Sequence, residues 1–548
     1  MPSLVLGPML RYVGEQAAVV WVETDAPCEV GVLSATAPTF HVEGHHYALL
    51  RIDGLEPGTP HEYEVMLDGE RAWPPEDSEY PPSVIRTYPR DGELRVAFGS
   101  CRLTVPHEPP YSLPRDEDER ARETDALYAL AAQMRSEPND RWPHLLLMLG
   151  DQVYADEVSP ETARYLERTR DTDQPPGERI ANFEEYTRLY QEAWGEPTLR
   201  WLLSTVSTAM IFDDHDVHDD WNISEAWVEE MRALDWWDGH IESAFMSYWL
   251  YQHIGNLGPE DQSDDDLLAK VQASDDGGAA LREFAGRADR EADGTRWSYC
   301  RDLGNTRLIV IDSRAGRVVE EGHRSMLDEE EWRWVEQQAA GDFDHLLLAT
   351  SVPLLLSPAM HELEAWNEAV CGGAWGSGAA RLGEKLRQGL DLEHWAAFGE
   401  SFKRLFELQR SVAAGERGRP PATIVALSGD VHHAYLHEVG FPRGSGVRSE
   451  VFQAVCSPFR NPLGRNERRV IRFAESTVGW RIARLLARAA GVEDPPVRWR
   501  LAGDGPWFDN QVATLEIEGR QLRMRIDKAF SGEDGAPGLE RVLDRRLA

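Results

Sequence analysis

Residues 144–156 read HLLLMLGDQVYAD, an apolar run that ends in a glycine and a polar cluster. Six such runs occur after residue 90, and five of them end in a polar cluster: GSCR, GDQVYAD, DDHDVHDD, DSR or SGDVHH. The runs are LRVAF (94–98), HLLLML (144–149), AMIF (209–212), RLIVI (307–311), HLLLAT (345–350) and TIVAL (423–427). Ligands of α/β sheets bind beyond the carboxyl ends of the strands. The pattern therefore predicts an α/β domain with one site built from segments far apart in the sequence.

The first 90 residues show a different pattern, of short strands separated by turn residues. The predicted strands are AAVVWVET (17–24), CEVGVL (28–33), YALLRIDGL (47–55) and HEYEVMLDG (61–69). LEPGTPHEYEV is similar to the corner of fibronectin type III sandwiches. We expect a fibronectin-III-like or Ig-like β-sandwich at residues 1–90 and a second domain at residues 91–548. Within that domain we expect a helical insertion at about residues 159–300 and, at WRIARLLARAA (480–490), an amphipathic helix docked on the body.

The composition excludes several classes of function. The chain has 548 residues and a formal net charge of −38, which argues against binding nucleic acid or an anionic membrane through a basic face. No stretch of about 18 apolar residues occurs, and the N-terminus does not have the pattern of a leader. We therefore expect a cytoplasmic protein without membrane contact. Five cysteines without a CxxC pair indicate neither a zinc ribbon nor a disulfide scaffold. Neither a G-x-S-x-G elbow nor a P-loop is present.

Asp151, Tyr154 and Cys101 predict a metal centre. Gly150 allows a tight turn after the strand and leaves Asp151 at its end, where one carboxylate can bridge two cations. Carboxylate and phenolate oxygens suit hard ions. Because the free pKa of tyrosine is about 10, only a strongly Lewis-acidic ion keeps it ionised at neutral pH. Together with a Cys101 thiolate, Tyr154 points to trivalent iron in at least one position.

The stretch DDHDVHDD gathers five aspartates and two histidines within residues 213–220. Buried carboxylates at this density are costly unless cations lie among them. We expect Asp214 to give the cluster a further carboxylate, and His215 to face the substrate as a general acid. In SGDVHH, Asp430 and His432 alternate along an extended turn, so that both reach the same ions.

FGSCR, GDQVYAD, DDHD and SGDVHH together resemble the motifs of the PhoD-like alkaline phosphatases, a branch of the calcineurin-like metallophosphoesterase superfamily. The resemblance covers roughly residues 1–530 and implies a four-layer α/β/β/α core. It also implies Fe³⁺ and Ca²⁺ as cofactors, with Mn²⁺, Mg²⁺ or Zn²⁺ as alternatives. Carried over by motif, the metal ligands are Cys101, Asp151, Tyr154, Asp214, Asp430 and His432.

The resemblance implies a phosphoric ester hydrolase that acts on a small phosphate ester as a phosphomonoesterase or phosphodiesterase. A metal-bound hydroxide would attack phosphorus in line, while His215 protonates the leaving group. Asn222 and either Arg102 or Arg314 are expected to contact the phosphate. The alternative is a non-catalytic protein, stabilised by metal, whose β-sandwich recognises a partner. Turnover of simple phosphate esters separates the two hypotheses.

Overall fold

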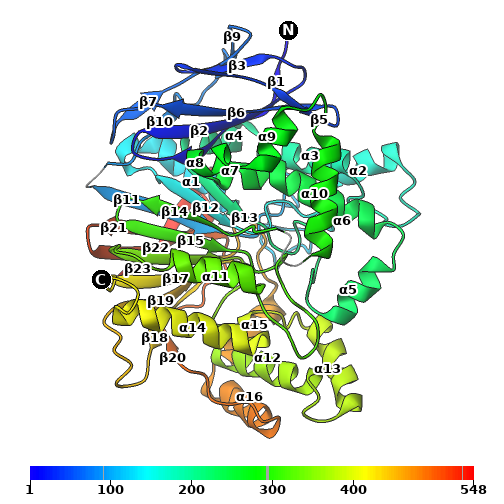
Figure 1. Cartoon of the computed structure of the whole chain (residues 1–548), viewed down its shortest axis with the longest axis vertical. Coiled ribbons are helices and arrows are strands. Elements are labelled where there is room, and N and C mark those ends of the chain that lie inside the picture. The colour runs from blue at the N-terminus through cyan, green and yellow to red at the C-terminus, as the bar shows by residue number, and fades with distance from the viewer. Residues whose placement is uncertain (90–91, 292–294, 534) are drawn as a thin grey trace.

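The structure is a computed structural model that describes residues 1–89, 92–291, 295–533 and 535–548. A β-rich N-terminal region lies at one end of the molecule, and a mixed α/β core with helices on its outside makes up the rest (Figure 1). The predicted domain boundary at residues 90–91 lies outside the described residues. None of the helices in the described ranges combines the length and the apolar character that crossing a bilayer requires.

The N-terminal region consists of antiparallel sheets, two with four strands and one with two. Their strands, in sheet order, are β1 (Leu4–Val13), β2 (Ala17–Thr24), β6 (His45–Asp53) and β5 (Phe40–Val42); β4 (Ala35–Pro38), β3 (Glu29–Val32), β8 (Val65–Leu67) and β9 (Glu70–Trp73); and β10 (Val84–Arg86) and β7 (Pro60–Glu62). The strand predicted at 61–69 is divided between β7 and β8, which belong to different sheets. Tyr63 lies between them, and its buried hydroxyl donates to the carbonyl oxygen of Ser204 at 2.6 Å. That inward contact interrupts the predicted strand.

The N-terminal sheets are docked on the rest of the chain. Arg11 of β1 is fully buried and donates to the carbonyl oxygens of Tyr251 and Gln252, at 2.5 and 2.6 Å. These two residues lie in a π-helical turn, Tyr248–His253. The apolar residues of the N-terminal sheets and of the first core sheet belong to one continuous hydrophobic cluster. The two parts therefore share a core instead of meeting across a polar interface.

The α/β core contains two sheets of mixed direction. The six-stranded sheet runs β13 (Ser207–Ile211), β12 (Leu145–Leu149), β11 (Glu93–Gly99), β21 (Gln511–Glu518), β22 (Gln521–Ser531), β23 (Pro537–Arg546). The seven-stranded sheet runs β14 (Tyr299–Leu303), β15 (Thr306–Ile311), β16 (His345–Thr350), β17 (Thr423–Ser428), β19 (Glu450–Val455), β18 (Tyr435–Gly440), β20 (Arg498–Leu501). β11, β12 and β13 are parallel, as are β15, β16, β17 and β19. All six predicted buried runs form strands, three in each sheet.

Alternate side chains of β15, β16 and β17 belong to different cores. Leu308 and Val425 pack in the cluster shared with the six-stranded sheet, whereas Ile309 and Ile424 pack on the other face with residues of α11 (Glu329–Gln338) and α14 (Gly399–Ala414). A strand buried on both faces is continuously apolar because neither set of side chains meets water. This is why these runs show no polar alternation in the sequence.

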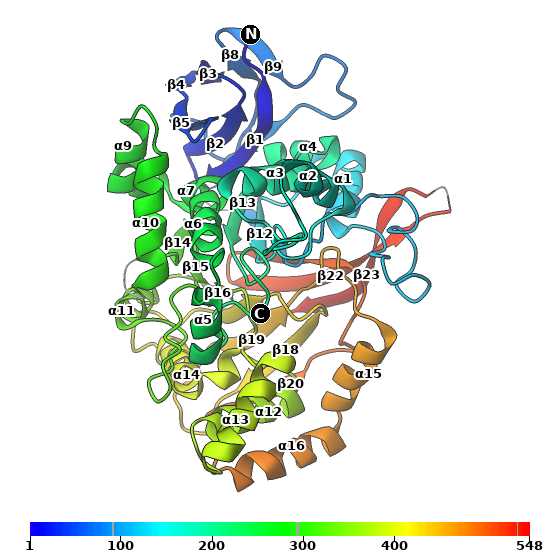
Figure 2. The same cartoon turned by 90° about the vertical axis from the view of Figure 1, so that its right-hand side faces the viewer.

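Helices surround the two sheets (Figures 1 and 2). They are α1 (Ala126–Ser136), α2 (Pro160–Thr169), α3 (Phe183–Trp194), α4 (Pro197–Thr205), α5 (Glu225–Arg232), α6 (Trp237–Ser247), α7 (Ile254–Asn256), α8 (Pro259–Ser263), α9 (Asp266–Gln272), α10 (Gly278–Arg290), α11 (Glu329–Gln338), α12 (Pro358–Cys371), α13 (Ser377–Gly389), α14 (Gly399–Ala414), α15 (Arg465–Ala474) and α16 (Thr477–Ala489). The segment predicted as a helical insertion holds α2 to α10, with β13 between α4 and α5. Figure 2 shows α15 and α16 at the end of the molecule opposite the N-terminal sheets.

Candidate metal centre

The carboxyl ends of strands from both sheets meet at one place. The amide of Cys101, after β11, donates to the carbonyl oxygen of Gly150, after β12, at 3.2 Å. The amide of Asp430, after β17 of the other sheet, donates to Ser100 Oγ at 2.9 Å. A Cβ atom at Gly429 would lie 2.1 Å from that Oγ, so the two sheets can approach this closely only with glycine there. Segments more than 300 residues apart are thereby held together.

Four of the predicted ligands have a left-handed backbone. The φ angles of Cys101, Asp151, Asp430 and His432 are 55°, 53°, 66° and 53°. This conformation costs a residue other than glycine about 1–3 kcal/mol, and it persists only where the surrounding structure imposes it. Such residues cluster at functional sites, and here they bring side chains from three strand ends, those of β11, β12 and β17, to one centre.

Carboxylate oxygens converge in this centre, and some of them have no hydrogen-bond donor among the described residues. Ligand atoms of Asp151, Asp213 and Asp214 lie within 4.8 Å of one another, and so do those of Cys101, Asp151 and His432. Among the described residues, nothing donates a hydrogen bond to the buried atoms Asp151 Oδ1 and Asp213 Oδ2. A buried carboxylate oxygen without a donor is costly unless a cation contacts it. The donor set, carboxylates with one thiol and one imidazole, therefore fits bound metal ions.

The ionisation of the carboxyl groups reflects the same crowding. Burial, together with the neighbouring carboxylates, raises the pKa of Asp151 and of Asp213 well above the ordinary value. Burial also raises the pKa of Asp214, to about 6, although the Arg314 guanidinium opposes the shift. Like charges held close together in a buried place resist ionisation. Cations bound among them would restore the charged forms.

Tyr154 and His215 lie beside the carboxylates. The hydroxyl of Tyr154 is 3.4 Å from Asp151 Oδ2, and its ring stacks on the His215 ring with centroids 4.6 Å apart. His215 Nδ1 lies 2.9 Å from Asp156 Oδ1. Burial lowers the pKa of His215, but Asp156 and Asp214 outweigh it and raise the pKa well above the ordinary value. These carboxylates favour the protonated imidazole, and 22% of the His215 side chain is exposed to solvent.

Arg314 lies inside the carboxylate cluster and is completely buried. It donates to Asp213 and Glu393, and its Nη2 lies 3.1 Å from Asp214 and 3.8 Å from Asp430. With these four partners around it, the guanidinium neutralises part of the cluster. Asn222 Nδ2 donates to the carbonyl oxygen of Arg314 at 3.1 Å, so Asn222 lies against the backbone of this residue. Contact of either residue with phosphate stays a prediction.

Arg102 is directed elsewhere. Its Nε donates to Asp125 Oδ2 at 2.8 Å, and its Nη1 donates to the carbonyl oxygen of Ala193 at 2.9 Å. The side chain is buried between α1 and α3. Its backbone amide donates to the carbonyl oxygen of Asp151 at 3.1 Å, while its guanidinium is turned away from the centre. Its contact with phosphate stays a prediction.

Several residues outside the predicted set hold the centre together. Asp216 accepts hydrogen bonds from the amides of Asp151 and Asp213, at 2.8 and 2.9 Å, and so ties the end of β12 to the end of β13. It lies in the DDHDVHDD stretch, where the density of aspartates was the available signal. Glu393 and His394 were also missed, because they lie in a loop that follows no apolar run.

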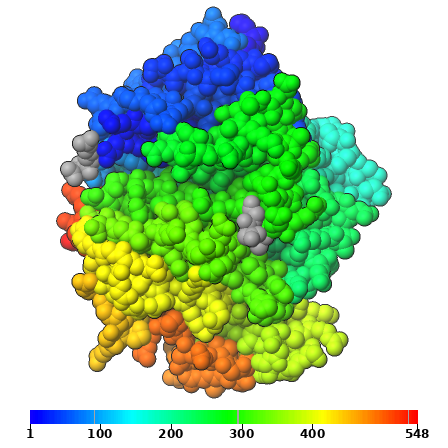
Figure 3. Space-filling view, in the orientation of Figure 1, coloured from blue at the N-terminus to red at the C-terminus, as the bar shows by residue number. Residues whose placement is uncertain are grey.

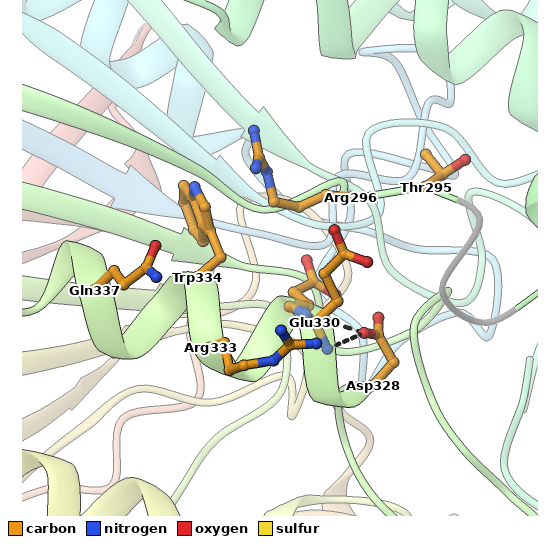
Figure 4. A pocket seen from close by; sticks show the side chains of 8 residues that line it. Thr295, Arg296, Asp328, Glu330, Arg333, Trp334 and Gln337 are labelled. Carbon is orange, nitrogen blue, oxygen red and sulfur yellow. Dashed lines mark hydrogen bonds between the residues drawn. The ribbon is translucent and has the colours of Figure 1, made fainter.

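A separate pocket of about 390 Å³ lies between α11 and the segment that leads into β14 (Figure 4). Arg296 lies over the ring of Trp334 in it, 4.6 Å from the centroid, beside Asp328 and Arg333. None of the predicted site residues lines this pocket. The converging ligand atoms, the left-handed residues and the carboxylate oxygens without a donor among the described residues all lie at the strand ends. We therefore assign the site to the strand ends.

Three comparisons relate the chain to known proteins. Residues 123–271 match the family model described as PhoD-like phosphatase, and residues 1–85 match a model described as a domain of unknown function (DUF7800). The search of curated proteins found no match. A solved structure described as the structure of PhoD is 12% identical, with a TM-score of 0.57, and the alignment covers 99% of this chain and 92% of that one. A purple acid phosphatase, PPD1 from yellow lupin (Lupinus luteus) seeds, is 11% identical with a TM-score of 0.45, and the alignment covers 100% and 74% of the two chains.

The antiparallel β region followed by a mixed α/β core resembles the fold of the solved PhoD structure. The chain contains a PhoD-like phosphatase domain. It is accordingly a hydrolase of the class that acts on phosphoric esters.

Proposed function

We propose that the protein is a metal-dependent phosphomonoesterase or phosphodiesterase in which His215 is the general acid. The observation that carries the proposal is the convergence of two buried carboxylate oxygens, Asp151 Oδ1 and Asp213 Oδ2, without hydrogen-bond donors among the described residues. The PhoD-like family match supports the same reaction class.

The proposed cofactors are Fe³⁺ and Ca²⁺. Cys101, Asp151, Tyr154 and His432 combine a thiol, a phenol, a carboxylate and an imidazole at one place, a donor set that suits iron. Asp214 and Asp430 extend the cluster with oxygen donors, to which Asp213 is added from the structure. When bound, the ions supply Lewis acidity towards the phosphoryl oxygens and towards water. Mn²⁺, Mg²⁺ or Zn²⁺ are the alternatives.

The chain's own residues provide the proton transfer. Asp156 holds Nδ1 of His215, and the ring of Tyr154 stacks on its face, so the imidazole is fixed in orientation. Its other nitrogen, Nε2, is then available to give a proton to the leaving oxygen as the bond to phosphorus breaks. Asn222 is held at the same centre by the backbone of Arg314, where its amide can contact a phosphoryl oxygen.

Metal analysis of protein purified without added metal tests the proposal. We expect iron and calcium, and a visible phenolate-to-iron absorption band. Tyr154→Phe should abolish the band, whereas Tyr186→Phe, at another buried tyrosine, should keep it. Asp151→Asn should lose metal and activity together. A colourless, iron-free enzyme with full activity would refute the iron assignment.

Comparing turnover of a nitrophenyl phosphate monoester with that of the bis-ester assigns the substrate class. Activity on either supports the hydrolase. A folded protein that contains metal and hydrolyses neither would instead support the alternative, a metal-stabilised binding protein that recognises a partner through its β-sandwich.

The finer fold assignment also remains a proposal. Two mixed sheets share one hydrophobic cluster, and α11 and α14 cover the outer face of the seven-stranded sheet. These contacts support a four-layer α/β/β/α core. The pair of four-stranded antiparallel sheets before residue 90 supports a fibronectin-III-like or Ig-like sandwich.

A further inference from the structure

Helix α16 buries its small residues and exposes its large apolar ones. Gly479, Ala483 and Ala487 are buried, and Ala483 packs with Ala359 of α12. The opposite face carries large apolar side chains with these exposed fractions: Val478 60%, Ile482 52% and Leu485 70%. An amphipathic helix of a soluble protein normally turns its large apolar residues to the core. The sequence led us to expect that this helix docks on the body, and it does so through these small residues and through the buried ion pair of Arg484 with Glu362 of α12.

The exposed apolar face continues on α15. Val470 and Phe473 are 61% and 55% exposed, and Trp480, in the first turn of α16, is 40% exposed. We call Val470, Phe473, Val478, Trp480, Ile482 and Leu485 the α15–α16 surface. Helix α16 lies at the end of the molecule farthest from the N-terminal sheets (Figures 2 and 3), and α15 packs beside it. Large apolar side chains exposed together on two neighbouring helices mark an interaction surface.

The net charge of helices α15 and α16 is opposite in sign to the net charge of the whole chain. Residues 465–489 contain seven arginines and two glutamates, a formal net charge of +5, whereas the chain carries −38. Arg469 and Arg481 are exposed and have no ion-pair or hydrogen-bond partner among the described residues. Each is next in sequence to an apolar member of the surface, Val470 or Ile482. Apolar side chains and unpaired cations are thus interleaved.

We propose that the α15–α16 surface binds the surface of an anionic lipid bilayer. A helix with a large exposed apolar face and arginines beside it is the pattern of an interfacial helix. Its apolar side chains would enter the headgroup region, and the long arginine side chains would reach the lipid phosphates. A second copy of this chain fits less well, because a two-fold contact would bring together two copies of the same positively charged patch.

The net charge of −38 led to the expectation of no membrane contact, but net charge is an average over the whole surface. Salt screens charges beyond about 8 Å at physiological ionic strength. The bilayer therefore interacts mainly with the charges nearest to it, and at this end of the molecule those include Arg469 and Arg481. The surface also adjoins the metal centre along the chain. The side-chain nitrogen Nδ2 of Asn461 lies 3.4 Å from the Tyr154 hydroxyl, and α15 begins four residues later.

Flotation of the full-length protein with lipid vesicles tests the proposal. We expect it to float with vesicles of phosphatidylcholine and phosphatidylglycerol in equal parts at about 0.1 M salt, and to bind pure phosphatidylcholine weakly. Raising the salt to about 1 M should release most of it. The double variant Ile482→Ser/Leu485→Ser should lower the bound fraction at least about tenfold. Arg469→Glu/Arg481→Glu should remove the preference for the anionic vesicles.

Matched controls separate docking from misfolding. Leu33→Ser alters a large apolar side chain that is 47% exposed on the N-terminal region, and Arg443→Glu alters an exposed arginine away from the surface. Both should bind like the unchanged protein, and every variant should keep its activity on a soluble phosphate ester. The proposal is overturned if the unchanged protein stays with the unbound fraction or if the controls lose binding equally. A dimer in solution that the Ile482→Ser/Leu485→Ser change dissolves would overturn it in favour of a second copy.

Discussion

Nε2 of His394 lies 2.8 Å from Oδ2 of Asp430, and Nδ1 of the same ring lies 2.6 Å from Oε1 of Glu364. The ring thus connects a carboxylate of the metal centre to one on α12. Asp430 is fixed in orientation by this contact in addition to its strained backbone. Residues that hydrogen-bond to a metal ligand without contacting the metal usually fix the orientation of that ligand.

Replacing His394 by glutamine should weaken metal binding without unfolding the protein. Loss of such a partner typically costs about 10- to 100-fold in metal affinity, because the carboxylate of Asp430 is no longer held in one position. Competition with a chelator measures the affinity. His361→Gln is the control, since this buried histidine packs against Phe402 and Trp499 away from the cluster. Equal affinities for His394→Gln and the unchanged protein would show that Asp430 is held by other groups.

The strand ends could be predicted from the sequence because each is a local event. A buried apolar run followed by glycine and aspartate fixes Asp151 at the end of β12, whatever the rest of the chain does. The same reasoning found Cys101, Asp214 and Asp430. The structure brings these four residues together, as the position of ligand sites in α/β sheets implies.

Residues that act through long-range contacts could not be predicted in this way. Arg314 follows a strand, as a phosphate-binding arginine would, and only the fold shows that carboxylates from three other segments surround it. His394 gives no local signal, because its partners lie 30 and 36 residues away. The exposure of the large apolar side chains of α16 could not be predicted either, because an amphipathic pattern does not show which face of a helix packs against the rest of the protein.

Replacing His215 by alanine should leave the metal in place and slow hydrolysis about 10²- to 10⁴-fold. The loss should be greatest for esters whose leaving groups are poor, because those depend most on a proton from the general acid. A series of aryl phosphates with leaving groups of increasing pKa measures this loss. In the variant, kcat/KM should fall more steeply with the leaving-group pKa than in the unchanged protein. Asp156→Asn should also make kcat/KM fall more steeply with the leaving-group pKa, but less so than His215→Ala, because Asp156 only holds the His215 ring. A rate loss that is equal for all leaving groups would remove His215 from the role of acid.

Replacing Arg314 by glutamine should lower stability more than substrate affinity. Its guanidinium is buried between Asp213 and Glu393, and removing one member of a buried ion pair costs about 3–5 kcal/mol because the partner charge is left unpaired. Urea denaturation of metal-free protein measures this loss. In the folded fraction, KM for a phosphate ester should be unchanged. The opposite result, a raised KM with unaltered stability, would return Arg314 to the phosphate contact expected from the sequence.

Stability should fall between about pH 6.5 and pH 9 through His45, which joins the N-terminal sheets to α3. Its Nδ1 lies 2.8 Å from Glu23 and its Nε2 lies 2.9 Å from Glu184. Burial opposes protonation, but the hydrogen bonds and charges of these carboxylates outweigh it and raise the pKa of His45 to about 9. Burial raises the pKa of the adjacent Tyr47 and Tyr251 well above 10, so both stay neutral in this range.

The sign of this effect follows from proton binding. Between the unfolded pKa of about 6.5 and the folded pKa of about 9, the native state binds a proton that the unfolded chain does not. The stabilisation is therefore complete below pH 6.5 and is lost as the pH rises through the folded pKa. Urea denaturation over this range should show the decline for the unchanged protein and for His323→Gln, an exposed control. His45→Gln should be less stable at pH 6 and should decline less, whereas parallel curves would mean that the bridge between Glu23 and Glu184 contributes nothing.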